Sequence, residues 1–165
     1  PARVSRLDSF IRRMMAQRAC LDRAAELVKD VPGPVLELGL GNGRTYDHLR
    51  ELMPGREIYV FEREVAAHPD CVPPAEYLIL GDGRETLPLM WDKFPHAAAL
   101  AHLDMGTGDA EANRHLAAEL APLLAPLLRP NAVVVSEPPL DLPGWLTLPL
   151  PPGVREGRYH MYRVG

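Results

Sequence analysis

The stretch that decides the fold is Val35-Leu36-Glu37-Leu38-Gly39-Leu40-Gly41-Asn42-Gly43-Arg44-Thr45. In it a short apolar run is followed by three glycines at alternate positions and then by a helix-forming segment. This order predicts a strand, a tight turn and a helix, because glycine readily adopts left-handed backbone angles and lets another group approach the main chain closely. The first N–H groups of the helix and the positive end of its dipole would then face a ligand in the turn.

An acidic residue follows the next predicted strand. Residues 44–52 predict a helix that ends before Pro54 and Gly55, and residues 58–61 form the apolar, β-branched and aromatic run typical of a strand. Glu62 comes directly after this strand. In a right-handed crossover the carboxyl ends of both strands share one edge of the sheet, where a carboxylate can accept hydrogen bonds from both ribose hydroxyls. The pattern predicts a nucleoside site; the alternative is an ordinary surface residue at a strand end.

The same alternation of strands and helices continues along the chain. Further strands are predicted over residues 77–80, 97–103, 132–136, 145–148 and 159–164, with helices over 86–91 and 110–121 and a turn over 127–131. Strands without polar alternation, separated by helices, predict a parallel sheet covered on both faces, and the last two strands predict an antiparallel pair. The expected fold is α/β, a single Rossmann-like three-layer sandwich with a seven-stranded, mostly parallel sheet and a C-terminal antiparallel strand pair.

An arginine-rich helical segment precedes this domain. Residues 5–31 predict a helix capped by Ser5 and Asp8, either continuous or bent near residues 16–20. Its apolar residues at helical spacing predict one buried stripe: Leu7, Phe10, Ile11, Met14, Leu21, Ala24, Ala25 and Val28. Its arginines are Arg3, Arg6, Arg12, Arg13, Arg18 and Arg23. One interpretation is that they form a solvated basic face. The other is that one of them, or Gln17, folds over the site and contacts an anionic ligand.

The composition fits one domain, with residues 1–33 as a helical segment packed on the core and residues 34–165 as the ligand-binding domain. The chain has 165 residues, 47% of them hydrophobic, and a net charge of -4, which argues against a general nucleic-acid binder. No apolar run approaches the roughly 20 residues of a membrane span, and no apolar leader is evident. We therefore expect a soluble cytoplasmic protein. Cys20 and Cys71 are expected to be buried or inert thiols.

At these positions the chain resembles the class I S-adenosylmethionine-dependent methyltransferases, over about residues 34–165. The first family motif, an acid followed by alternating glycines, is matched by residues 37–43, and the acid after the second strand is matched by Glu62. Gly81-Asp82-Gly83 matches a third motif, and Leu127-Leu128-Arg129-Pro130 is similar to the family's turn before the fifth strand. Four motifs in this order are specific, although each alone is modest.

The resemblance implies a cofactor, S-adenosyl-L-methionine, with S-adenosyl-L-homocysteine as the product. The residues it assigns to this cofactor are Glu37, Gly39, Gly41, Asn42, Gly43, Glu62, Arg63, Asp82, Gly83 and Asp104. Among them Glu62 would bind the ribose, and Asp82 with Gly83 the adenine. Glu37 would meet the methionyl amino end or orient the turn.

Asp104 is the candidate catalytic residue that the resemblance suggests. It would lie beside the sulfonium, facing the acceptor, where a carboxylate could stabilise positive charge or take a proton from an attacking hydroxyl or amine. The structural alternative is a cap on the following turn through Thr107 or Gly108. His102 and His160 are expected to be core residues rather than bases.

The predicted acceptor is a small molecule. Asp104-Met105-Gly106-Thr107 stands where nucleic-acid amino methyltransferases commonly carry an Asn/Asp-Pro-Pro-aromatic tetrad, which disfavours base methylation. We expect no separate substrate domain after the last predicted strand. We therefore expect a small stand-alone bacterial member of the family that acts on a small molecule. This molecule could be anionic, because the N-terminal arginines could bind it. The N-terminal helix or the strand edge at Trp145 could form a homodimer face.

Several alternatives remain open from the sequence. No metal is assigned, although Asp104, Asp109 and Glu137 could collect as magnesium ligands, as in catechol-type methyltransferases. A non-catalytic nucleoside-binding protein or partner subunit would share the same cofactor motifs. A NAD-dependent oxidoreductase would need glycine where Arg44 stands, and an aminopropyltransferase would need an acid-rich polyamine pocket that the sequence does not require.

Overall fold

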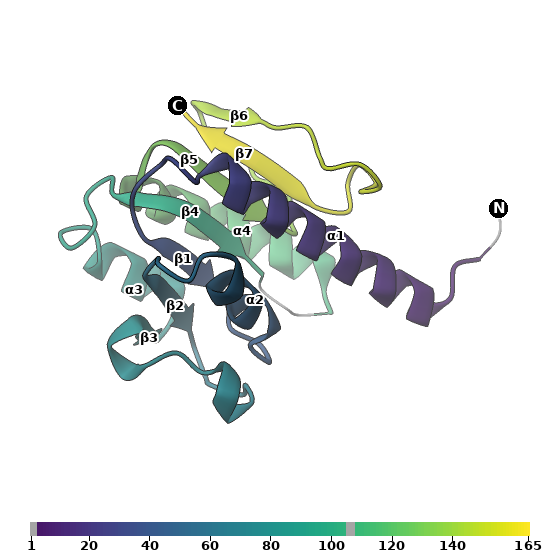
Figure 1. Ribbon diagram of the computed structural model, residues 1–165, viewed down its shortest axis with the longest axis horizontal. Coiled ribbons are helices and arrows are strands. Elements are labelled where there is room, and N and C mark those ends of the chain that lie inside the picture. Colours follow the sequence, from purple (N-terminus) through teal and green to yellow (C-terminus); the bar gives the residue numbers. More distant parts are fainter. Residues whose placement is uncertain (1–2, 105–107) are drawn as a thin grey trace.

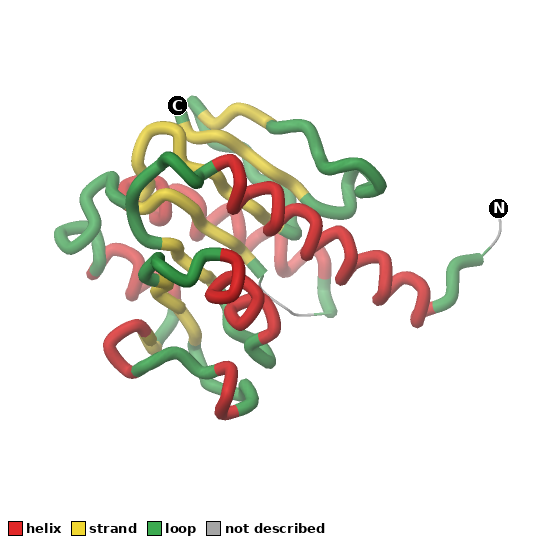
Figure 2. The backbone as a smooth tube through the Cα atoms, viewed as in Figure 1, coloured by secondary structure: helices red, strands yellow, loops and turns green. Residues whose placement is uncertain are grey.

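The computed structural model describes residues 3–104 and 108–165. Its helices are α1 (Arg6–Leu27), α2 (Arg44–Leu52), α3 (Gly83–Leu89) and α4 (Ala110–Leu124). Its strands are β1 (Val35–Leu38), β2 (Ile58–Glu62), β3 (Leu78–Leu80), β4 (Ala98–Leu103), β5 (Leu128–Ser136), β6 (Trp145–Thr147) and β7 (His160–Val164). Three short 3-10 helices, η1 (Pro69–Cys71), η2 (Ala75–Tyr77) and η3 (Ala125–Leu127), complete the described elements. Figures 1 and 2 show a central sheet with helices on both sides.

Within the described residues, seven strands form one sheet in the order β3-β2-β1-β4-β5-β7-β6. The first five strands run parallel, and β7 runs antiparallel between β5 and β6. From β1 the chain adds β2 and β3 on one side, and it then crosses to the other side of β1 to add β4 and β5. Ligands of doubly wound sheets bind at the carboxyl ends of the strands where this change of side occurs. The predicted α/β sandwich with its C-terminal antiparallel pair is therefore confirmed.

Two apolar cores flank the sheet, because neighbouring residues of each buried strand point to opposite faces. On one face α1 and α2 pack over residues such as Val35, Val60 and Val133. On the other face α3 and α4 pack over Leu36 and Leu38. The parallel strands are buried on both faces, which explains why the sequence shows apolar runs rather than alternation. No helix of the described chain is long and apolar enough to cross a membrane.

The predicted bounds of the central strands agree closely with the observed ones. Predicted and observed bounds differ where a proline interrupts the sequence pattern. The turn predicted over residues 127–131 is wrong, because β5 already begins at Leu128. Ala98 pairs with Leu128 and Leu100 with Val133, so extra residues of β5 form an irregularity within the strand. Asn131 lies there with a left-handed φ of 71°, the geometry that asparagine tolerates.

The N-terminal segment forms one continuous helix, α1. Of the two forms expected from the sequence, the one bent near residues 16–20 is wrong. Ser5 caps it as predicted, its Oγ accepting a hydrogen bond from the Asp8 amide at 3.0 Å. The buried stripe is wrong for its first turns, since Leu7 is 67% exposed and Ile11 is 44% exposed. The reason is visible in Figure 1, where the first turns of α1 extend beyond the edge of the sheet and have no layer beneath them.

The glycines of the turn after β1 serve different purposes. Gly43 has a φ of +84°, and a Cβ there would lie 2.5 Å from the Cβ of Cys71 and 2.7 Å from its carbonyl oxygen. Gly41 has a φ of +53°, but a Cβ there would meet nothing within 4 Å. Gly43 is therefore required by the chain's own packing against η1, whereas the space over Gly41 is open to a ligand.

Replacing each of these two glycines by alanine should separate backbone strain from steric overlap. Gly41→Ala should lower the free energy of unfolding by about 1–2 kcal/mol, the strain of a left-handed residue with a Cβ. Gly43→Ala should lower it by about 1–3 kcal/mol more, because Cys71 must also move. Urea denaturation of both variants measures this difference; equal losses would contradict the packing role of Gly43.

Candidate functional site

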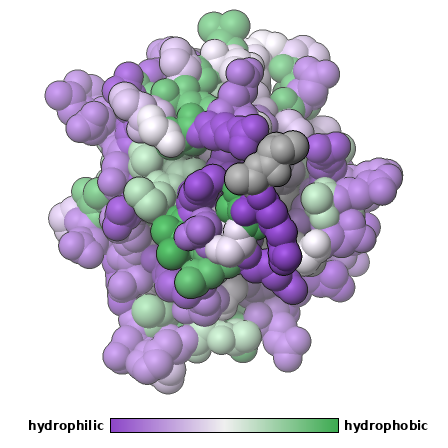
Figure 3. Space-filling view, turned by 90° about the vertical axis from the view of Figure 1, so that its right-hand side faces the viewer, coloured by the Kyte–Doolittle hydropathy of each residue, from purple (hydrophilic) through white to green (hydrophobic). Residues whose placement is uncertain are grey.

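Two cavities adjoin the carboxyl ends of the parallel strands. The first, which we call the turn cavity, has a volume of about 370 Å³ and lies between the glycine turn, the end of β2 and the start of α3. Its lining includes Gly39, Gly41, Glu62, Arg63, Asp82, Gly83, Arg84 and Asp104. Seven of the ten residues assigned to the cofactor from the sequence lie in this lining. Figure 3 views the molecule from the side toward which β4 runs in Figure 1, where hydrophilic side chains surround a group of apolar ones.

Glu62 holds the glycine turn in place. One carboxylate oxygen, Oε2, accepts hydrogen bonds from the amides of Leu40 at 2.6 Å and Gly41 at 3.1 Å. The other, Oε1, accepts a bond from the amide of Arg63 at 2.8 Å. The side chain thus bridges the ends of β1 and β2, and it lines the turn cavity at the position expected for a ribose contact.

Asp82 caps α3 at the opposite side of the turn cavity. Its Oδ1 accepts hydrogen bonds from the amide of Arg84 at 2.9 Å and from the Arg84 guanidinium at 3.1 Å. These contacts lower the pKa of Asp82, the backbone amide first and the guanidinium second. Asp82 therefore remains an anionic hydrogen-bond acceptor at neutral pH, with Gly83 beside it in the cavity wall.

Glu37 lies beneath the turn, in a buried position. Its side chain has 0% exposure, its Oε2 accepts a hydrogen bond from Thr45 Oγ1 at 2.9 Å, and its Oε1 lies 2.5 Å from His102 Nδ1. Burial raises the pKa of Glu37, partly offset by His102. Burial alone would lower the pKa of His102, but the carboxylates of Glu37, Asp104 and Glu137 together outweigh it, Glu37 most of all, and the net shift is upward. These contacts fit the second of the two roles expected for Glu37, orienting the turn.

A chain of buried hydrogen bonds continues from His102 to Asp104. His102 Nε2 lies 2.6 Å from the Tyr159 hydroxyl, which also accepts a bond from Gln17 Nε2 at 3.0 Å. The second N–H of Gln17 donates to Asp104 Oδ2 at 3.0 Å. Burial, followed by the charge of Asp104, raises the pKa of Tyr159 well above its usual value, so the phenol stays protonated. Gln17, on α1, therefore fixes one oxygen of the candidate catalytic carboxylate.

Asp104 and Glu137 form a pair of neighbouring carboxylates after β4 and β5. Burial raises the pKa of Glu137, Asp104 raises it further, and the guanidinium of Arg13 lowers it in part. Arg13 Nη1 lies 3.5 Å from Glu137 Oε1. Asp104 lines the turn cavity, whereas Glu137 lines the second cavity, so the pair places one carboxylate in each cavity.

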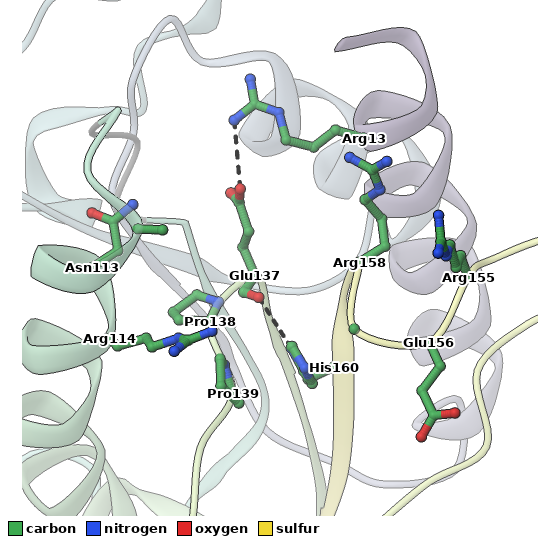
Figure 4. Close-up of a pocket in the computed structure, with 12 residues that line it drawn as sticks. Arg13, Asn113, Arg114, Glu137, Pro138, Pro139, Arg155, Glu156, Arg158 and His160 are labelled. Atoms are coloured by element: carbon green, nitrogen blue, oxygen red, sulfur yellow. Dashed lines mark hydrogen bonds and ion pairs between the residues drawn. The ribbon is translucent and has the colours of Figure 1, made fainter. Parts of the chain in front are cut away.

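The second cavity, which we call the arginine cavity, has a volume of about 530 Å³. Four elements contribute to it: α1, the first turns of α4, the chain after β5 and the loop before β7. Its polar lining residues are Arg13, Asn113, Arg114, Glu137, Arg155, Glu156, Arg158 and His160 (Figure 4). The sequence offered Arg13 and Glu137 as candidates, and it missed the other arginines because they belong to no motif. The expectation that His160 is a core residue is wrong, because it is half-buried and lines this cavity.

The remaining predicted residues lie as follows. Asn42 is exposed in the turn. Asp109 caps α4, its Oδ1 accepting bonds from the amides of Glu111 and Ala112 at 3.1 Å each. His160 Nδ1 lies 3.0 Å from the carbonyl oxygen of Glu137. The expected cap through Thr107 and the segment Met105-Gly106-Thr107 lie outside the described residues. Within the described part of the chain, no three His, Cys, Asp or Glu side chains are grouped to hold a metal ion.

The comparisons with known proteins agree with this arrangement. Residues 4–164 match the model of the S-adenosyl-L-methionine methyltransferase family. The chain belongs to this family. The methyltransferase is 51% identical to an S-adenosyl-L-methionine methyl transferase from Silicibacter pomeroyi DSS-3, with a TM-score of 0.94 and a match covering 99% of this chain and 100% of that one. Among curated protein sequences it has no match.

More distant structures share the fold of the methyltransferase. Human methyltransferase-like protein 13 in complex with S-adenosylhomocysteine is 14% identical, with a TM-score of 0.56 over 93% of this chain and 80% of that one. A 16S rRNA (adenine(1408)-N(1))-methyltransferase from Catenulisporales acidiphilia, with bound S-adenosylmethionine, is 12% identical, with a TM-score of 0.50 over 87% and 91% of the two chains. The family match, rather than these distant likenesses, makes S-adenosylmethionine the cofactor and methyl transfer the activity. It does not support the oxidoreductase, aminopropyltransferase or non-catalytic alternatives.

The buried chain of hydrogen bonds predicts a stability effect for one hydroxyl group. Tyr159→Phe leaves His102 Nε2 and one N–H of Gln17 without a partner in a buried environment, so the free energy of unfolding should fall by about 1–3 kcal/mol. Tyr59→Phe is the control, because the Tyr59 hydroxyl donates to Glu57, whose side chain is exposed and can bond to water instead. Urea denaturation should show a clearly smaller loss for the control; equal losses would contradict the prediction.

Proposed function

We propose that this methyltransferase transfers the methyl group of S-adenosylmethionine, bound in the turn cavity, to a small molecule bound in the arginine cavity. The observation that carries the proposal is the pair of neighbouring carboxylates, of which Asp104 lines the turn cavity and Glu137 lines the arginine cavity. A cofactor and an acceptor in these two cavities would react beside this pair, because bringing two reactants into contact is a large part of the catalysis of such a displacement.

The lining of the turn cavity fits the cofactor. The open space over Gly41 admits an adenosyl-containing ligand to the main chain. Glu62 would accept hydrogen bonds from the ribose, and Asp82 with Gly83 would meet the adenine, with Arg63 and Gly39 in the cavity wall. Glu37 and Gly43 would act by holding the turn, since Glu37 is buried beneath it and Gly43 is buried within it.

The carboxylate pair supports a role in proton transfer. Bound S-adenosylmethionine supplies a methyl group on a sulfonium, whose sulfur leaves with the bonding electron pair as a neutral thioether. The acceptor's O–H or N–H must lose a proton, and Asp104 or Glu137 would take it. A carboxylate whose pKa is raised toward neutrality, as that of Glu137 is, holds such a proton better at neutral pH.

The size of the arginine cavity supports a small acceptor. A volume of about 530 Å³ lies within the range of roughly 300–1,000 Å³ that is typical of small-molecule sites. The net charge of -4 also opposes a long contact with a nucleic-acid backbone.

Ligand-dependent melting tests the cofactor site. S-adenosylmethionine or S-adenosylhomocysteine at about 100 times its Kd should raise the melting temperature by about 5–10 °C, whereas NAD should not. Glu62→Gln keeps an acceptor oxygen for the turn amides but loses the carboxylate, so it should lose most of the shift. Glu51→Gln, an exposed change on α2, should retain it. A full shift in Glu62→Gln would contradict the ribose role.

Methyl transfer from tritiated S-adenosylmethionine tests the acceptor class. With a bacterial extract divided into dialysable small molecules, RNA and protein, label should enter the dialysable fraction. Asp104→Asn should lower the rate by about 10²–10⁴-fold, the usual contribution of a positioned proton acceptor. The same variant should still bind S-adenosylhomocysteine. Label found only in RNA or protein would contradict a small acceptor, and an unchanged rate would contradict the role of Asp104.

A further inference from the structure

Four arginines from three parts of the chain converge on the arginine cavity. Arg13 comes from α1, Arg114 from α4, and Arg155 and Arg158, which we call the loop arginines, from the segment before β7. The lining contains two carboxylates, Glu137 and Glu156. The chain as a whole has 22 acidic and 18 basic residues, so this excess of positive charge is a local exception.

Most of this charge is not neutralised by the protein. Arg13 pairs with Glu137, but Arg114, Arg155 and Arg158 have no carboxylate within 4.0 Å among the described residues. Arg84, at the turn cavity, shows the contrast, because both Asp82 and Glu119 lie 3.1 Å from its guanidinium. Guanidinium groups that outnumber the carboxylates of a cavity and are not paired with them create a positive potential that an anionic ligand relieves.

The loop arginines are held by a rigid anchor. The amide of Arg158 donates to the carbonyl oxygen of Arg155 at 3.0 Å, which closes a turn between them. The next residue, Tyr159, is fully buried and bonded to His102 and Gln17. Figure 4 shows the loop arginines on one side of the cavity and Arg114 on the other, with Glu137 between them. The positive groups are thus positioned on either side of the proposed proton acceptor.

We propose that the acceptor carries a carboxylate or phosphate group, which the loop arginines and Arg114 bind while the nucleophilic O–H or N–H is presented to Glu137 and Asp104. This inference rests on the proposed function and names the substrate class of the same site. Arginine suits the task because its planar fork binds both oxygens of a carboxylate or phosphate at once. One fixed anion at the arginines would orient the rest of a small acceptor toward the carboxylate pair.

Binding of simple anions tests this proposal without knowledge of the acceptor. The protein is first titrated calorimetrically with S-adenosylhomocysteine, and the saturated protein is then titrated with inorganic phosphate and, separately, succinate at constant ionic strength. At least one anion should bind, and the better one identifies the group. Arg155→Gln/Arg158→Gln should weaken it about tenfold or more through loss of charge-assisted hydrogen bonds. Arg114→Gln, on a separate element, should weaken it in the same direction.

A double variant of equal charge change is the control. Arg12→Gln/Arg23→Gln removes two exposed arginines of α1 that line neither cavity, and it should bind the anion as the wild type does. Binding of S-adenosylhomocysteine without either anion would overturn the anionic acceptor and leave the cofactor site standing. Equal anion affinity in the Arg155→Gln/Arg158→Gln variant and the wild type would also overturn the anionic acceptor. A loss of anion affinity in the control as large as in this variant would do the same. Failure to bind S-adenosylhomocysteine would overturn the proposed function itself, and this inference with it.

Discussion

The structure depends on a buried pair of ionisable side chains, Glu37 and His102, which lie opposite each other on β1 and β4. Their closest atoms are 2.5 Å apart and neither side chain is exposed. Taking two such groups out of water is unfavourable unless each is fully hydrogen-bonded, and removing one partner of such a pair typically destabilises a protein by about 3–5 kcal/mol. The surrounding layers therefore have to supply the remaining partners.

Those partners come from three separate segments around the site. Thr45 on α2 satisfies Glu37, Tyr159 before β7 satisfies His102, and Gln17 on α1 joins Tyr159 to Asp104. The helix after the glycine turn, the N-terminal helix and the loop that bears Arg158 are thus fixed relative to one polar centre. This explains how residues far apart in sequence line the turn cavity on one side of the Asp104–Glu137 pair and the arginine cavity on the other.

Much of the fold and of the turn cavity could be predicted from local sequence patterns. The apolar run before Gly39, the glycine spacing and Glu62 after β2 place both strands and their common edge, because a right-handed crossover leaves few alternatives. The errors have physical reasons: the first turns of α1 keep an amphipathic spacing although no layer lies beneath them, and Asn131 gives a turn-like signal within β5 because a strand can absorb extra residues as an irregularity.

The sequence by itself determined the fold class, the order of elements and much of the polar lining of the turn cavity, because these follow from periodicity or from short motifs at the ends of the strands. Only the tertiary structure decided that Glu37 is buried against His102, that Gln17 holds Asp104, and that Arg114, Arg155 and Arg158 surround Glu137. These contacts join segments with no local relation to one another. They arise from which faces the helices present to the sheet and from the need to satisfy each buried polar group.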